Sequence, residues 1–491
     1  MAPLSPTASR APRPGALLCL VAALTMCASL RPQGIEGVLA RPSLRGLTVA
    51  VAVADAETGE RLFGRNIDRP MVPASNLKLL TTAGAIAELG ADWRFTTRLL
   101  GTAPLDADGI LHGDLVLWGS GDPSMRRDVF DAVGLPDPAV HLARLAQRAG
   151  LRRVDGALLL DEAYLDREVL HPDWEPSDLT NDYAAPISAL SIHANCLDLL
   201  VDGNRGSTSP ALRIETLVDG YQLRNEVDFA PRPNVLSVGA LRPDAGSRVT
   251  VRGRISRGER FPFRVPVVDP PLFFGRCLSA ALRQADIPVE GGVQRESGAA
   301  SLHPGAEVLA EHLASLEWPV TLANKQSDNS MADHLFKVLG AERGDRGSFA
   351  GGERAMLSFL RDRVGTSTDG IVLRDGSGLS AKNRITTRVM VDTLVAMQLT
   401  NEAERGMFLR SLPVSGVDGS LEQRLSEAPY RGAVRAKTGW ITGASALSGF
   451  VHTATGRVLA FSVLINGLRP GQNKAMKAVQ DDLCRALYDN W

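Results

Sequence analysis

Apolar residues form strand-like runs at both ends of the chain. Residues 47–53 are a continuous run of β-branched and small apolar residues, and a second short run at residues 61–63 follows a turn, so a β-hairpin is predicted here. Residues 446–451 and 458–465 are apolar runs separated by turn residues, which indicates two antiparallel strands. The spacing of apolar residues over residues 473–488 predicts a helix after these strands.

Helical periodicity dominates the sequence next to these strands. Leucine, isoleucine and alanine recur at helical spacing over residues 75–89, and Gly90 is placed to end that helix. The same spacing returns over residues 331–336 and 387–397. In contrast, the stretch from about residue 95 to 315 consists of short β-like runs broken by Gly, Pro and Asp.

These patterns predict an α/β (α+β) domain that is interrupted by a long insertion. Residues 41–95 and 316–491 would form one discontinuous domain with an antiparallel sheet and helices, because strands lie at both chain ends. Residues 96–315 would be an inserted β-rich region of one or two small domains.

The first thirty residues are typical of a secretory signal peptide. Arg10 and Arg13 precede an uncharged apolar run that ends in small residues near Cys27, and this run is shorter than the roughly 20 residues of a membrane-spanning helix. An uncleaved anchor and, more weakly, a lipoprotein signal at Cys27 are the alternatives. We therefore expect an exported, periplasmic protein, either free or loosely associated with the membrane.

Composition narrows the class of protein. The chain has 491 residues, of which 44% are hydrophobic and 22% charged, so it is too apolar to be disordered and too polar for a protein with many membrane spans. Its formal net charge of −1 provides no basic field for nucleic acid. The sequence predicts no oligomeric state.

Cysteine and histidine give no sign of a metal centre. Two of the five cysteines fall in the predicted signal, which leaves Cys196, Cys277 and Cys484. One disulfide is compatible with an oxidising compartment, but the favoured interpretation is three buried thiols. The eight histidines form no HExxH or HxxEH motif, and no CxxC is present, so neither metal nor cofactor is predicted.

Lysine is rare, which draws attention to the few lysines present. Only seven of the 54 Lys and Arg residues are lysines, and unlike arginine a lysine can be deprotonated. Lys78 is the one lysine with a serine three positions earlier, Ser75, and this spacing puts both on one face of a helix. A desolvated lysine can activate a serine nucleophile. The alternative is a helix-capping serine followed by a solvated lysine.

Two further short motifs carry suitable chemistry. Ser327-Asp328-Asn329 supplies a second hydroxyl for proton transfer and an amide that can hold a peptide, although Ser and Asp also serve as ordinary helix caps.

Lys437-Thr438-Gly439 is predicted to lie on a strand. Its cation and hydroxyl could bind a carboxylate, and Gly439 would allow a substrate backbone to approach closely. The alternative is an edge strand protected by a lysine.

Together, and in this order, the three motifs resemble the SxxK, SxN and KTG triplet of penicillin-binding proteins and serine β-lactamases. Ser75 and Ser327 are 252 positions apart, and Ser327 and Lys437 are 110 apart. The long first interval resembles the D-alanyl-D-alanine carboxypeptidase/endopeptidase branch, the low-molecular-mass class C penicillin-binding proteins. Residues 375–380 (DGSGLS) and 183–190 (YAAPISAL) are further matches. The resemblance implies a penicillin-binding-protein/serine β-lactamase-like transpeptidase fold.

The resemblance also implies roles for the residues that match. Ser75 would attack the penultimate D-Ala carbonyl and form an acyl-enzyme, Lys78 would accept its proton, and Ser327 would protonate the leaving amine with Lys437 nearby. Asn329 would bind the peptide backbone.

Three more positions follow from the same resemblance. Thr438 with Lys437 would bind the terminal carboxylate, and the backbone N–H groups of Ser75 and Trp440 would form the oxyanion hole. Directly after KTG the family usually has a smaller, often hydroxylated residue, and this chain has Trp440. The preference of the enzyme for an acceptor or for a substrate side chain therefore does not follow from the resemblance. Asp161 resembles an inserted-region residue that recognises the diamino acid of the stem peptide.

The predicted function is that of a serine D,D-peptidase acting on peptidoglycan stem peptides and cross-links without metal or cofactor, and acylated at Ser75 by β-lactams. A β-lactamase is the nearest rival, but no ExxLN segment of the class A type lies between Asn329 and Lys437. A non-catalytic peptidoglycan-binding protein and a generic esterase are two further hypotheses. Both Ser75 and Lys78 are present, and no GxSxG motif supplies another nucleophile.

Overall fold

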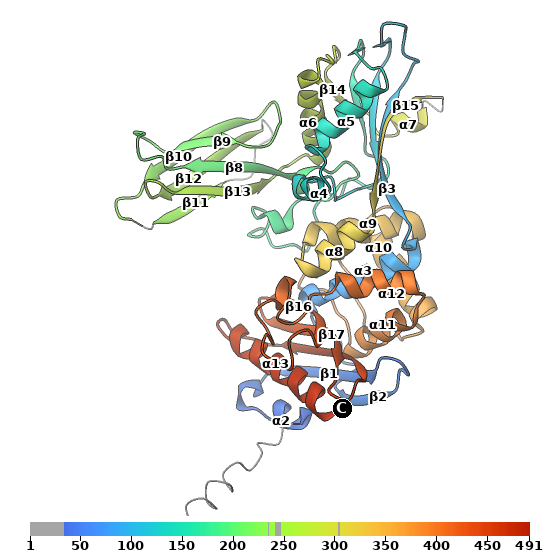
Figure 1. The fold of residues 1–491 in the computed structure, drawn as a ribbon, viewed down its shortest axis with the longest axis vertical. Helices are drawn as coiled ribbons and strands as arrows, with labels where there is room; N and C mark the ends of the chain where they lie inside the picture. The colour runs from blue at the N-terminus through green and yellow to red at the C-terminus, as the bar shows by residue number, and fades with distance from the viewer. Residues whose placement is uncertain (1–33, 234, 241–246, 303–304) are drawn as a thin grey trace, which may run out of the picture.

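The computed structural model describes residues 34–233, 235–240, 247–302 and 305–491. The predicted signal peptide, with Cys19 and Cys27, lies outside the described residues. Figure 1 shows an elongated molecule in which the two ends of the chain build the lower part and the middle of the chain builds the upper part. Within the described ranges, every helix is too short or too polar to cross a bilayer.

A five-stranded antiparallel sheet in the lower part joins both ends of the chain. Its strand order is β16-β17-β18-β1-β2. The strands are β1 (Thr48–Asp55), β2 (Arg61–Arg65), β16 (Val434–Ile441), β17 (Ala444–His452) and β18 (Val458–Asn466). The hairpin and the two C-terminal strands predicted from the sequence are confirmed.

Alternating valine and alanine explain why β1 is buried on both faces. Side chains of a strand point alternately to opposite faces, so Val49, Val51 and Val53 lie on one face of the sheet. There they pack in one cluster with α2 (Ile35–Leu39) and α13 (Asn473–Asn490).

The alanines Ala50, Ala52 and Ala54 lie on the opposite face and join the core of a helical layer. This layer contains α3 (Leu77–Leu89), α8 (Glu317–Lys325), α9 (Asn329–Arg343), α10 (Phe349–Phe359), α11 (Thr387–Leu399) and α12 (Glu402–Ser411). The small side chains allow α11 to lie close to β1 and β18. The helices predicted at 75–89, 387–397 and 473–488 are confirmed, except that the first begins with a 3-10 turn (Ala74–Asn76).

The described residues of the upper part form a second five-stranded sheet and three sheets of two or three strands. Strands β3 (Arg94–Gly101) and β15 (Glu307–Ser315) pair antiparallel and carry the chain out of the lower part and back to it. They belong to a sheet of order β14-β7-β5-β3-β15, with β5 (Leu115–Gly119), β7 (Leu158–Asp161) and β14 (Val293–Arg295). The remaining sheets are β13-β8-β9, β10-β12-β11 and β4-β6. Their strands are β4 (Ile110–Leu111), β6 (Arg153–Val154), β8 (Cys196–Asp202), β9 (Ala211–Ile214), β10 (Gln222–Phe229), β11 (Leu236–Ala240), β12 (Arg248–Ile255) and β13 (Arg260–Pro266).

The upper part also contains helices that the sequence pattern did not predict. These are α4 (Arg127–Ala132), α5 (Pro138–Arg148), α6 (Pro270–Gln284) and α7 (Ala299–Leu302). Asp137 and Asp269 cap α5 and α6, and each cap is followed by a proline, which fits the first turn of a helix. Helices α5 and α6 pack against each other and complete the core of the upper part.

Candidate active site

Ser75 lies in a tight turn that is held between two neighbouring segments. It is the middle residue of the 3-10 turn that leads directly into α3, and Lys78 occupies the first turn of that helix. The Nζ atom of Lys78 is 3.0 Å from Ser75 Oγ. Behind the turn, a Cβ atom on Gly378 would come within 2.0 Å of the Ala74 carbonyl oxygen. The turn therefore depends on a glycine at position 378.

Lys78 is fully buried and its amine is surrounded by acceptors. Its Nζ donates to Asn329 Oδ1 and to the Ser377 carbonyl oxygen, both at 2.7 Å. Burial disfavours the ammonium form and lowers the pKa of Lys78 to about 8, although the nearby carboxyl groups of Asp333 and Asp375 oppose this shift. A lysine in this state can accept a proton near neutral pH.

The second motif meets the third at a hydroxyl–amine contact. Ser327 has a left-handed backbone conformation (φ 62°) just before α9, whose first turn is capped by the side chain of Asp328. Lys437 Nζ donates to Ser327 Oγ at 2.8 Å and to the Thr438 carbonyl oxygen at 2.9 Å. The pKa of Lys437 is well below its usual range because the side chain is fully buried and lies near Lys78.

Gly439 is needed because β16 lies directly against the turn that carries Ser75. A Cβ atom on Gly439 would come within 2.8 Å of the Pro73 carbonyl oxygen and 2.9 Å of the Asn76 backbone nitrogen. Asn76 Nδ2 also donates to the Lys437 carbonyl oxygen at 2.8 Å. The sequence pattern suggested that Gly439 admits a substrate, whereas the packing of the protein against itself already requires it.

A cavity of about 210 Å³ opens where these segments converge. Ser75, Ser327, Thr438, Gly439 and Trp440 all line it. Lys78 and Lys437 contact its two serines, and Asn329 contacts Lys78. Trp440 is largely exposed, with 55% of the residue accessible to solvent. The structure thus brings together every predicted site residue except Asp161. It also adds residues from outside the motifs, namely Ser420, Arg424, Ser445, Ala446, Lys477 and Gln480.

Asp161 lies at the end of β7, and its carboxylate serves the fold. The group is buried, and its oxygens accept hydrogen bonds from the backbone nitrogens of Ala163, Gly298 and Ala300. These hydrogen bonds hold the neighbouring loop, and the recognition role expected for Asp161 stays a prediction.

Residues of the upper part support the second motif, and the sequence pattern did not identify them. Arg126 is buried and donates to Asp328 Oδ2 at 2.5 Å while also pairing with Asp128. Asn329 Nδ2 donates to the Tyr183 carbonyl oxygen at 2.9 Å. Tyr183 opens the stretch that carried a family match, but nothing distinguishes Arg126 among 47 arginines.

A buried polar network holds the loop that contacts Lys78. Asp333 accepts from the backbone nitrogens of Gly376 and Ser377, both at 2.8 Å, and burial beside Asp375 raises its pKa well above the usual range. Asp375 in turn accepts from Gly378 N at 2.8 Å. These contacts fix the Ser377 carbonyl that receives the Lys78 hydrogen bond.

Other side chains that are capable of chemistry do not take part in this cluster. Lys325 forms an ion pair with Asp418. Cys196, Cys277 and Cys484 are free and buried, which agrees with the thiol interpretation. Among the residues that the structure describes, no group of three or more His, Cys, Asp or Glu side chains is arranged to hold a metal ion.

Comparisons with known proteins identify the family of this chain. The model of the D-Ala-D-Ala carboxypeptidase 3 (S13) family matches residues 32–487. The D-alanyl-D-alanine carboxypeptidase of Actinomadura sp. (strain R39) is 33% identical over 472 residues, covering 93% of this chain and 84% of that protein. The D-alanyl-D-alanine carboxypeptidase DacB of Haemophilus influenzae is 27% identical over 435 residues, or 85% of this chain and 86% of that one.

The crystal structure of penicillin binding protein 4 (dacB) from Haemophilus influenzae has the same fold, with a TM-score of 0.78 and 25% sequence identity over 92% of this chain and 99% of that chain. The chain therefore belongs to the D-Ala-D-Ala carboxypeptidase 3 (S13) family, a family of peptidases. The predicted family resemblance and the predicted fold class, a mixed α/β penicillin-binding-protein fold with an antiparallel sheet, are both confirmed.

Proposed function

We propose that this protein is a serine D,D-peptidase of peptidoglycan that uses Ser75 as its nucleophile. The observation that carries the proposal is the pairing of two buried lysines with two serines in one cavity: Lys78 with Ser75 at 3.0 Å and Lys437 with Ser327 at 2.8 Å. A serine hydroxyl needs an adjacent base, and Lys78 with its lowered pKa is suited to that task.

The acylation step uses these groups in sequence. Ser75 Oγ attacks the carbonyl carbon of the penultimate D-Ala while its proton passes to Lys78 Nζ. The tetrahedral oxyanion is stabilised by the backbone N–H groups of Ser75 and Trp440. As the C–N bond breaks, the leaving amine takes a proton from Ser327 Oγ, which Lys437 holds by a hydrogen bond. The proton that Lys78 took from Ser75 then passes to Ser327, so Lys78 is neutral and Ser327 is a hydroxyl again before deacylation begins.

Deacylation returns the enzyme to its starting state. A water molecule gives its proton to Lys78 and attacks the acyl carbon, and the ester bond to Ser75 breaks with protonation of Oγ. In this proposal Asn329 binds the peptide backbone of the substrate and Thr438 binds its carboxylate. The acceptor is water in this scheme, so the products are a shortened stem peptide and the released amine.

The family and the polar cavity support a peptidoglycan peptide as the substrate. Terminal D-Ala-D-Ala and D-alanyl cross-links present the same amide to the same catalytic atoms, so we propose both carboxypeptidase and endopeptidase activity. β-Lactams would acylate Ser75 as substrate mimics; the Haemophilus influenzae penicillin binding protein 4 has been crystallised in complex with a β-lactam. We further propose export to the periplasm, a catalytic domain of residues 41–95 and 316–491, and an inserted region of residues 96–315.

Intact-mass spectrometry after treatment with benzylpenicillin tests the proposal. The wild-type protein is expected to gain one stable adduct of the drug, and Ser75→Ala is expected to gain none. Synthetic stem peptides and cross-linked muropeptides should then be hydrolysed by the wild type alone. Rapid loss of the drug with no persistent adduct would instead indicate a β-lactamase, and an unmodified folded protein with intact drug would indicate a binding protein.

A further inference from the structure

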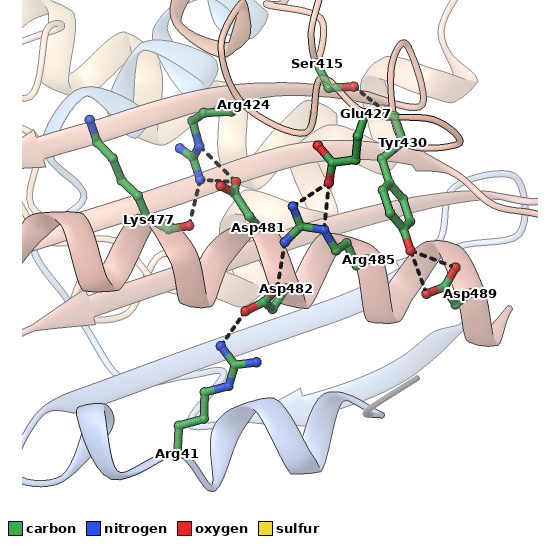
Figure 2. A network of polar contacts seen from close by, with 10 residues as sticks. All are labelled: Arg41, Ser415, Arg424, Glu427, Tyr430, Lys477, Asp481, Asp482, Arg485 and Asp489. Atoms are coloured by element: carbon green, nitrogen blue, oxygen red, sulfur yellow. Dashed lines mark hydrogen bonds and ion pairs between the residues drawn. The ribbon is translucent and has the colours of Figure 1, made fainter. Parts of the chain in front are cut away.

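The cavity that contains Ser75 is also lined by two cations that belong to none of the three motifs. Arg424 lies in the segment after Ser420, and Lys477 lies in the first turns of α13. Figure 2 shows the two side chains next to each other at this end of the helix. Because hydroxyl groups line the same cavity, its chemistry suits an anionic group of the substrate.

Arg424 is already neutralised by the protein. Its Nε and Nη2 atoms donate to Asp481 Oδ1 at 2.9 and 2.7 Å, and Nη2 also donates to Gln480 Oε1 at 3.1 Å. The same nitrogen donates to the backbone carbonyl of Lys477 at 3.2 Å. Arg424 therefore holds the helical turn that carries Lys477, and Asp481 balances its charge, although its Nη1 atom has no hydrogen-bond partner among the described residues.

Lys477 differs from the charged residues further along α13. Those side chains are engaged: Asp482 with Arg41 and Arg485, and Arg485 also with Glu427 (Figure 2). Lys477 is exposed and forms no ion pair with any residue in the described part of the chain. Of the two cations that line the cavity, Lys477 is thus the one whose charge no described residue balances.

Lys437, a third cation near the cavity, is poorly suited to hold a carboxylate. It is completely buried, and its Nζ is already committed to Ser327 Oγ and to the Thr438 carbonyl oxygen. Burial and the nearby Lys78 lower the pKa of Lys437, which weakens its ability to serve as a counter-charge. Thr438 Oγ1 faces the cavity and lies 2.9 Å from Ser420 Oγ, so two hydroxyls are present without a cation of their own.

We propose that Lys477 is a specificity-determining residue that binds the terminal carboxylate of the substrate together with the hydroxyl groups of Thr438 and Ser420. This inference rests on the proposed D,D-peptidase function, because it assigns the carboxylate next to the scissile amide. Arg424 is a positioning residue in this arrangement, since it holds the Lys477 turn through a backbone hydrogen bond.

The test compares a blocked D-Ala-D-Ala tripeptide that ends in a free carboxylate with the same peptide ending in a carboxamide. The variants are Lys477→Gln and the control Lys474→Gln, which removes the same charge from the same helix at an exposed position outside the cavity. In Lys477→Gln, the ratio of kcat/KM for acid over amide is expected to fall about tenfold, chiefly through a higher KM for the acid. Lys474→Gln should keep the wild-type ratio.

The outcomes separate the inference from the function on which it rests. If the wild type cleaves the peptides but Lys477→Gln keeps the wild-type ratio, the assignment of Lys477 is wrong and the proposed function stands. An equal fall of the ratio in both variants would indicate a general field effect and would also overturn it. If the folded wild type cleaves neither peptide and is not acylated by benzylpenicillin, both the function and the inference fail.

Discussion

The two halves of the cavity use their polar groups in opposite ways. In the inner group, formed by Ser75, Lys78, Ser327, Asn329 and Lys437, both lysines are completely buried and every side chain is tied to another by a hydrogen bond.

In the outer group, formed by Ser420, Thr438, Trp440 and Lys477, the side chains are exposed or half-buried, and only one hydrogen bond between two of them is present, from Thr438 to Ser420. Burial shifts the pKa of an amine and prepares it for proton transfer, whereas an exposed cation stays charged and can recognise an anion. The comparison indicates that chemistry resides in the inner group and substrate choice in the outer group.

Substitution of Lys78 should have the largest effect. Lys78→Arg keeps a positive charge but cannot be deprotonated, so it should lower kcat/KM at least about 10³-fold, close to the effect of Lys78→Met. The rate of acylation by benzylpenicillin should fall in parallel. Thermal unfolding would identify a folding defect, and substantial activity in a folded Lys78→Arg protein would contradict the role of Lys78 as a base.

Gly439→Ala tests whether the inner group depends on the close approach of β16. The new Cβ atom would press on the Pro73 carbonyl oxygen and the Asn76 nitrogen, so the turn that carries Ser75 must move. A displacement of about 1 Å can lower the rate about 10²-fold, and we expect that loss mainly in kcat. Gly239→Ala is the matched control, because Gly239 also lies on a strand and its Cβ would meet no atom within 4 Å. A normal kcat for Gly439→Ala would show that the contact is not needed.

The pH dependence of kcat/KM should report the buried lysines of the inner group. Lys78 must be neutral to accept a proton, and its pKa is lowered to about 8, so activity should rise about tenfold per pH unit up to that value and then level off. Because Lys437 lies close to Lys78, the apparent pKa belongs to the pair. A rise that continued beyond about pH 10, as for an exposed lysine, would contradict the effect of burial.

The sequence predicts the inner group well because its chemistry requires particular residue types at particular spacings. A serine three positions before one of only seven lysines, followed by SxN and KTG motifs, is difficult to attribute to chance. The strands of the main sheet were also predictable, since apolar runs such as residues 47–53 are long and uninterrupted.

The sequence does not predict contacts that depend on how distant segments meet. The ion pair between Arg126 and Asp328 joins residues 202 positions apart, and neither has an unusual local pattern. Asp161 shows the same limit, because a short sequence likeness predicts a binding role and gives no sign that the carboxylate also holds a loop. Lys477 is one of only seven lysines, but it belongs to none of the three motifs. Only its position in the lining of the cavity identifies it.

Trp440→Thr should have the smallest effect and would sharpen the division between the two groups. Only the backbone N–H of Trp440 belongs to the proposed oxyanion hole, and the residue is largely exposed. Replacement should therefore change the acylation rate by benzylpenicillin by about threefold or less. The ratio of rates for cross-linked and terminal substrates should change more, because the exposed indole lines the cavity that we expect a larger leaving group to occupy. If kcat fell as far as in Gly439→Ala for every substrate, the outer group would be part of the catalytic machinery and the division would not hold.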